Sequence, residues 1–179
     1  MKVLVTGGAA SGKSAYVEQL VMEWEGPHYY LATMSSLGCE AQLRIDRHLA
    51  LRDGKGFITL DMEQLGVEGV FDVLKKQRGT VLLEDLGNLV TSFLYTRQGF
   101  LLDEDQVFER TMMFIDALAE RCDNVVVVCS RVGADGSFAA ASDSYVALIG
   151  RVSCAIAAQY DHVIEVVFEQ PVAVKGACL

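Results

Sequence analysis

Eight residues near the start of the chain have the spacing of a phosphate-binding loop, Gly7-Gly8-Ala9-Ala10-Ser11-Gly12-Lys13-Ser14. An apolar run, Val3-Leu4-Val5, precedes them, and residues 15–21 continue with helical apolar spacing. Backbone N–H groups of such a loop face inward and bind anions at a helix N-terminus. Lys13 would then contact the β- and γ-phosphates, and the Ser14 hydroxyl would ligate Mg²⁺. The pattern therefore predicts a site for a nucleoside triphosphate.

A second group of candidate residues follows an apolar run further along the chain. Residues 79–85 read as a buried strand that ends in two carboxylates, Glu84 and Asp85. An acid at such a place holds or orients magnesium in phosphate-loop enzymes. We therefore expect Ser14, Glu84 and Asp85 to form a magnesium site, with a surface acid after a core strand as the alternative.

The elements that position these residues alternate between strands and helices. Predicted strands cover 3–5, 28–33, 57–61, 79–85, 124–129, 162–168 and 171–175. Predicted helices cover about 13–24, 40–52, 63–76, 87–98, 104–121 and 142–160. This alternation predicts an α/β fold with a mostly parallel sheet, helices on both faces and a C-terminal antiparallel hairpin at the sheet edge.

Ligands of open parallel sheets bind at the carboxyl ends of the strands. The phosphate loop, Thr33, Asp61, Glu84 and the loop after Cys129 all follow such ends. We therefore expect the active site to gather there.

Composition excludes several classes of function. The chain has 179 residues, which suits a single domain over 1–179, and 51% of them are apolar. The net charge of −9 argues against a nucleic-acid groove, and no apolar run approaches a membrane span. Five scattered cysteines favour reduced thiols in a cytoplasmic protein, and we expect no signal peptide.

The ordered set of motifs resembles the bifunctional adenosylcobinamide kinase / adenosylcobinamide-phosphate guanylyltransferase family of cobalamin biosynthesis. The matching segments are the phosphate loop, Tyr30-Leu31-Ala32-Thr33, Arg44-Ile45-Asp46-Arg47-His48 with Arg52, Thr59-Leu60-Asp61, Leu82-Leu83-Glu84-Asp85 with Val90-Thr91, Val132-Gly133, Gly150-Arg151-Val152 and Val174-Lys175. The resemblance spans nearly the whole chain. It implies a phosphate-loop NTPase (RecA-like) fold.

The resemblance also implies an activity and its residues. His48 would be the nucleophile that takes GMP from GTP, with Lys13 assisting catalysis in the shared loop. The implied nucleotide-binding residues are Gly7, Gly8, Ala9, Ala10, Ser11, Gly12, Lys13, Ser14, Thr33, Met34, Ser35, Arg52, Asp61 and Glu84. The implied cofactor is Mg²⁺, and the implied substrates are GTP or ATP together with adenosylcobinamide and its phosphate. The implied assembly is a homotrimer.

The chain departs from the family pattern at several positions. Ser130-Arg131 stands where the family has Asn-Glu, and Asp61 stands where it has a longer acid. Two alternatives therefore stay open. One is a small-molecule kinase in which His48 only contacts nucleotide, and the other is a nucleotide-binding relative without turnover.

Overall fold

The computed structural model describes residues 1–34, 54–94, 103–131 and 143–179 of the chain. Within them, the strands are β1 Lys2–Gly7, β2 His28–Ala32, β3 Phe57–Asp61, β4 Thr80–Glu84, β5 Asn124–Ser130, β6 His162–Val167 and β7 Gln170–Lys175. The helices are α1 Lys13–Met22, α3 Met62–Leu74, α4 Leu86–Leu94, α5 Glu104–Arg121 and α6 Asp143–Gln159. The helix expected over 40–52 lies outside the described residues.

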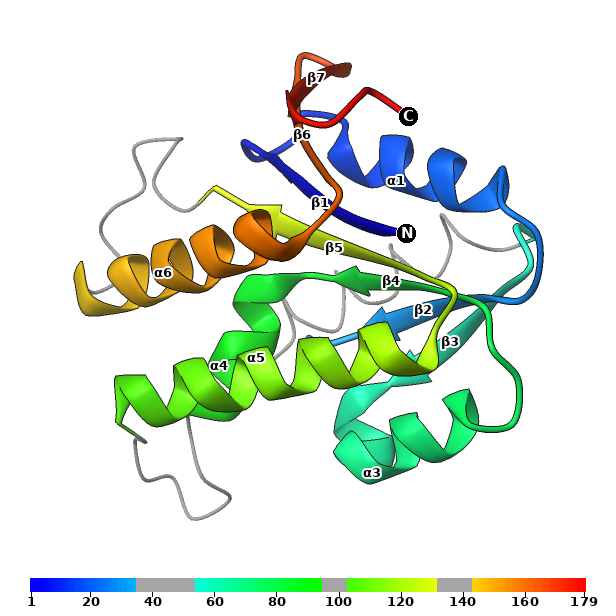
Figure 1. Cartoon of the computed structure of the whole chain (residues 1–179), viewed down its shortest axis with the longest axis horizontal. Coiled ribbons are helices and arrows are strands. Elements are labelled where there is room, and N and C mark those ends of the chain that lie inside the picture. The colour runs from blue at the N-terminus through cyan, green and yellow to red at the C-terminus, as the bar shows by residue number, and fades with distance from the viewer. Residues whose placement is uncertain (35–53, 95–102, 132–142) are drawn as a thin grey trace.

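These strands form one sheet in the order β3-β2-β4-β5-β1-β6-β7. Every neighbouring pair is parallel except β6 and β7, which are antiparallel (Figure 1). The expected mostly parallel sheet with an antiparallel hairpin at its edge is confirmed. The apolar run of β5 is buried from Val125 to Cys129, as a central strand covered on both faces requires.

Helices cover both faces of the sheet. Residues of α1, including Val17 and Leu20, pack on one face against Val3 and Val5 of β1. The other face packs against α3, α4, α5 and α6, and Leu4 of β1 points into that larger core (Figure 1). Successive side chains of a strand point to opposite faces, so each central strand contributes to both cores.

Side-chain caps begin two of the helices, and a glycine interrupts one of them. The helix expected over 63–76 is interrupted at Gly66, whose φ of 65° is left-handed, and it begins after Asp61, whose side chain accepts hydrogen bonds from Glu63 N and Gln64 N. Asp103 likewise caps α5 by accepting from Asp105 N, so the acidic run 103–105 belongs to a helix start as expected.

Candidate functional site

The phosphate loop connects the end of β1 to the start of α1. Ala10 and Gly12 have φ angles of 54° and 91°. Left-handed backbone of this kind occurs in the concave turns whose N–H groups bind anions. The Lys13 side chain is 8% exposed, and its Nζ donates to the Gly8 carbonyl oxygen at 3.0 Å. The lysine thus lies folded over the loop, where its charge can meet a phosphate.

One polar atom inside this loop is buried. The Ser11 hydroxyl is buried and, among the described residues, forms no hydrogen bond. A buried hydroxyl without a partner costs free energy, which an anion that accepts a hydrogen bond from it would recover. The loop therefore fits a phosphate group.

The candidate magnesium ligands meet across the sheet. Ser14 Oγ lies 2.5 Å from Glu84 Oε1, although 70 positions separate the two residues. Tyr30 Oη, on β2, donates to the other carboxylate oxygen, Glu84 Oε2, at 3.2 Å. Hydroxyl and carboxylate oxygens are the hard ligands that Mg²⁺ prefers, usually one or two from protein together with phosphate oxygens. The donor set fits magnesium.

Thr33 and Asp85 stabilise the end of β4 near this pair. Thr33 Oγ1 lies 3.2 Å from the Glu84 carbonyl oxygen and 2.9 Å from that of Asp85. Asp85 Oδ1 accepts from Asn88 N at 2.9 Å, so this carboxylate also caps the first turn of α4. Met34 follows Thr33 at the same edge of the sheet. Thr33 and both acids therefore lie together, as expected.

Asp61 lies apart from the phosphate loop. It ends β3, the edge strand, which is four strand positions from β1. At about 4.8 Å per strand this places it about 19 Å from the end of β1. Its side chain caps α3, so its contact with nucleotide stays a prediction. His48, Ser35 and Arg52 lie outside the described residues, and their roles also stay predictions.

The departure at Ser130-Arg131 lies beside the phosphate loop. Arg131 N donates to the Gly7 carbonyl oxygen at 3.0 Å. The Arg131 guanidinium pairs with Glu165 of β6 at 2.5 Å, and this pair is partly exposed. The substitution therefore brings a cation to the carboxyl edge of the sheet next to the loop.

The thiol of Cys129 lies near the same edge but is protected. It is 5% exposed, and its Sγ lies 3.4 Å from Ser153 Oγ. Burial raises the pKa of Cys129, which the Ser153 hydrogen bond opposes. The neutral thiol form is therefore favoured at neutral pH, and we assign it no nucleophilic role.

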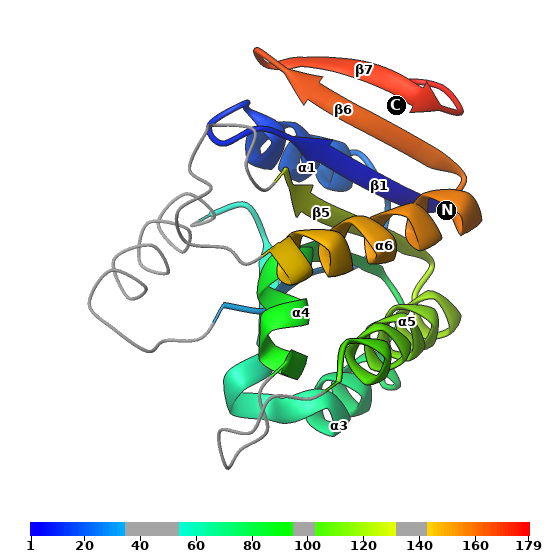
Figure 2. The same ribbon diagram turned by 90° about the vertical axis from the view of Figure 1, so that its left-hand side faces the viewer.

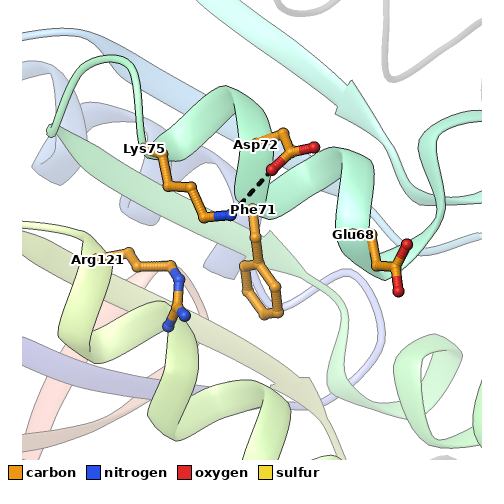
Figure 3. A pocket seen from close by; sticks show the side chains of 5 residues that line it. All are labelled: Glu68, Phe71, Asp72, Lys75 and Arg121. Carbon is orange, nitrogen blue, oxygen red and sulfur yellow. Dashed lines mark hydrogen bonds and ion pairs between the residues drawn. The ribbon is translucent and has the colours of Figure 1, made fainter.

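A shallow pocket lies elsewhere on the molecule. Glu68, Phe71, Asp72 and Lys75 of α3 and the following turn line it together with Arg121 of α5 (Figure 3). The Arg121 guanidinium lies over the Phe71 ring at 4.7 Å, and Lys75 pairs with Asp72. Lys75 and Arg121 end helices that lead into the amino ends of β4 and β5, the edge opposite the phosphate loop. The pocket is therefore at the other end of the strands from the candidate site at the loop.

Sequence reasoning missed two contacts of this site. Tyr30 was part of a motif, but its bond to Glu84 was not foreseen, although both residues occupy neighbouring parallel strands. The bond of Glu169 N to the Ser11 carbonyl oxygen had no sequence signal, because it joins segments 158 positions apart at 2.8 Å.

Comparison with protein families decides which kind of phosphate-loop protein this is. The model of the family described as cobinamide kinase / cobinamide phosphate guanyltransferase matches residues 3–174. The chain belongs to this family. Its members are transferases of cobalamin biosynthesis, so the expected family, enzyme class and nucleotide-binding character are confirmed.

Solved structures with a fold similar to that of this chain include two phosphate-loop NTPases. One is the KaiC-like protein PH0186 from the archaeon Pyrococcus horikoshii OT3, at 14% identity and a TM-score of 0.52, covering 92% of this chain and 71% of that one. The other is an isolated ATPase domain, at 11% identity and a TM-score of 0.54, covering 92% of this chain and 68% of that one. These likenesses confirm the phosphate-loop NTPase fold.

A search of the curated proteins finds no match to the chain. No helix within 1–34, 54–94, 103–131 and 143–179 combines the length and apolar character that crossing a membrane requires.

Proposed function

We propose that this family member phosphorylates adenosylcobinamide and then transfers GMP from GTP to adenosylcobinamide phosphate through a guanylylated His48. The observation that carries the proposal is the family match over residues 3–174. The complete phosphate loop, with Lys13 folded over it and Ser14 beside Glu84, supports the triphosphate chemistry that both steps need.

In the kinase step, the hydroxyl oxygen of the aminopropanol arm attacks the γ-phosphorus of GTP or ATP. The bond to the β-phosphate oxygen breaks, a nucleoside diphosphate leaves, and the hydroxyl proton is released. The loop N–H groups and Lys13 would hold the triphosphate and stabilise the charge on the leaving diphosphate. Ser14 and Glu84, with Asp85 nearby, would hold magnesium, which would supply neutralisation of the phosphate charge.

In the guanylyl step, a neutral imidazole nitrogen of His48 attacks the α-phosphorus of GTP, and pyrophosphate leaves. A phosphate oxygen of the corrinoid substrate then attacks the same phosphorus, and the phosphorus–nitrogen bond breaks. The product is adenosylcobinamide-GDP. Thr33, Met34, Ser35, Arg52 and Asp61 would contact the nucleotide, and a homotrimer would be the working assembly.

Intact-protein mass spectrometry after incubation with GTP and Mg²⁺ tests the guanylyl step directly. We expect a mass gain of one GMP. The adduct should be labile to acid, because phosphoramidates hydrolyse at low pH. The His48→Ala variant should show no gain, while phosphorylation of cobinamide stays measurable. His162→Ala is the matched control, because His162 opens β6 and bonds to Ala177 near the C-terminus.

An adduct that persists in His48→Ala would refute His48 as the nucleophile. Phosphorylation of cobinamide without any adduct would favour the small-molecule kinase. Nucleotide binding with neither reaction would favour a relative without turnover.

A further inference from the structure

The last strand of the sheet has a free edge. β7 is outermost in the order β3-β2-β4-β5-β1-β6-β7, and among the described strands it pairs with β6. Figure 2 shows β7 at the rim of the sheet, with β6 between it and β1. An edge strand carries a row of main-chain N–H and C=O groups that can pair with another strand. The segment 170–175 is therefore a template for one further strand.

Side chains of β6 alternate between the two faces of the sheet. Val163 packs in the core with α3, α4, α5 and α6, whereas Ile164 and Val166 pack in the core with α1. Glu165 and Val167 therefore point to the same face as Val163, because side chains two positions apart on a strand share a face.

β7 extends this face with apolar side chains. Val172 pairs with Glu165 in the register and so lies on the same face, and Val174 follows two positions later. The exposed fractions are 40% for Val167, 49% for Val172 and 64% for Val174, and Phe168 at the turn is 90% exposed. We call Val167, Val172 and Val174 the valine patch. Exposed apolar side chains that adjoin one another mark surfaces for protein contacts.

Charge does not protect the middle of this edge. Edge strands that stay unpaired commonly carry charged side chains or proline along their length. In β7 these lie near the ends, where Pro171 is second and Lys175 is last, and residues 172–174 are valine, alanine and valine. The chain has a net charge of −9, so contact with another copy is least opposed where acidic side chains are absent. The middle of β7 is such a place.

The charges at the two ends of β7 favour one orientation of a second copy. Glu169 is exposed and directly precedes the strand, whereas Lys175 ends it and donates to the carbonyl oxygens of Ala157 and Ala158. About 20 Å of extended chain separates the two charges. An antiparallel copy brings Lys175 of the partner subunit toward Glu169, whereas a parallel copy sets like charges side by side.

We propose that β7 pairs edge to edge with β7 of a second copy of this chain, antiparallel and across a two-fold axis. The two copies then share one continuous sheet, and their valine patches form a single apolar strip on one of its faces. A two-fold contact uses the same surface on both copies, so it is distinct from any three-fold contact. It turns a monomer into a dimer and a trimer into a hexamer. The inference goes beyond the proposed function and does not depend on it.

Sedimentation equilibrium of Val174→Lys tests the pairing. The molar mass of the assembly should be half that of the parent protein, because each copy brings a new charge into the apolar strip. Val174→Thr keeps a β-branched, uncharged side chain and should keep the parent mass. Met113→Lys is the matched control, because Met113 is an exposed apolar residue of α5, 71% exposed, and this variant should also keep the parent mass.

A parent protein with an odd number of copies, a monomer included, would overturn the proposal. So would a parent mass in Val174→Lys whose circular dichroism is that of the folded protein. A mass reduced to one third would assign β7 to a three-fold contact and would equally refute the two-fold pairing.

Hydrogen exchange of the parent protein gives a test that needs no variant. Pairing on one side leaves alternate N–H groups of an antiparallel strand without a partner, whereas pairing on both sides bonds all of them. The amides of Val172, Ala173 and Val174 should therefore all exchange slowly, and fast exchange at any of the three would refute the pairing. Mass and exchange are measured without substrate, so a failed cobinamide assay changes neither result.

Discussion

Glu84 connects three elements through a single carboxylate. One oxygen meets Ser14 of α1, the other accepts from Tyr30 of β2, and the residue itself ends β4. Tyr30 is 4% exposed, so its bond fixes the carboxylate from the buried side and leaves the Ser14 side for a ligand. This arrangement makes Glu84 the residue on which metal-assisted chemistry should depend most.

We expect Glu84→Gln to lower kcat for cobinamide phosphorylation about a hundredfold, because an amide keeps the shape but loses the charge that holds magnesium. Binding of Mn²⁺ with nucleotide, followed by electron paramagnetic resonance, should weaken in parallel. Tyr30→Phe is the matched comparison, and it should have a smaller effect because the carboxylate remains. If Glu84→Gln binds the metal as tightly as the parent protein does, Glu84 is not a metal ligand.

Titration of Cys122 should make the stability of the fold, not the chemistry of the site, depend on pH. The residue is 3% exposed, and burial raises the pKa of its thiol from the ordinary value to about 11. Above pH 9 the unfolded chain loses this proton while the folded chain retains it. The free energy of unfolding should therefore fall as pH rises from 9 to 11, by up to about 2 kcal/mol.

Urea unfolding of the parent protein and of Cys122→Ala between pH 8 and 10.5 measures this contribution. The variant should lose less stability over that interval. Cys154→Ala is the control, because Cys154 is exposed on α6. If the free energy of unfolding depends equally on pH in the parent protein and in Cys122→Ala, Cys122 does not contribute to that dependence.

At the scale of elements, the β6–β7 hairpin packs against the phosphate loop. The loop glycines differ in what they tolerate: Gly12 has a left-handed φ and lies against Glu169, whereas a Cβ on Gly8 would meet nothing within 4 Å. We therefore expect substitution by alanine to lower the free energy of unfolding by different amounts at Gly12 and at Gly8.

Gly12→Ala should lower the free energy of unfolding by about 1–3 kcal/mol, because it combines strain with a collision. Gly8→Ala should change it by less than about 0.5 kcal/mol when nucleotide is absent. Chemical denaturation of both variants checks this, and similar losses would indicate that the hairpin does not constrain the loop.

At the scale of the whole molecule, two cores share one sheet. Trp24 packs with the α1 core, whereas α3, α4, α5 and α6 belong to the opposite core. Since the same central strands serve both, we expect the chain to unfold as one domain. Trp24 fluorescence and far-UV circular dichroism should give the same urea midpoint, and Mg²⁺ with GTP should raise both.

Separate midpoints for the two signals would contradict a single cooperative domain. Coincident midpoints without a shift on adding nucleotide would leave the domain prediction intact but contradict the loop as a nucleotide site.

The sequence by itself determined the parts that depend on local pattern. Alternating periodicity was enough for the α/β order, the buried run of β5 and the helix starts at Asp103 and after Gly12. The phosphate loop was readable because its glycines, Lys13 and Ser14 are contiguous, so one short segment contains the whole anion site. The family, too, followed from motifs in sequence order.

Only the tertiary structure decided which distant residues meet. Strand order placed Glu84 of β4 beside Ser14, Tyr30 behind both, and Asp61 at the far edge as a helix cap. It also set Glu169 against the loop, leaving Phe168 exposed at its border. Periodicity shows which face of a strand is buried, but the neighbours of that strand are chosen by the packing of all elements together.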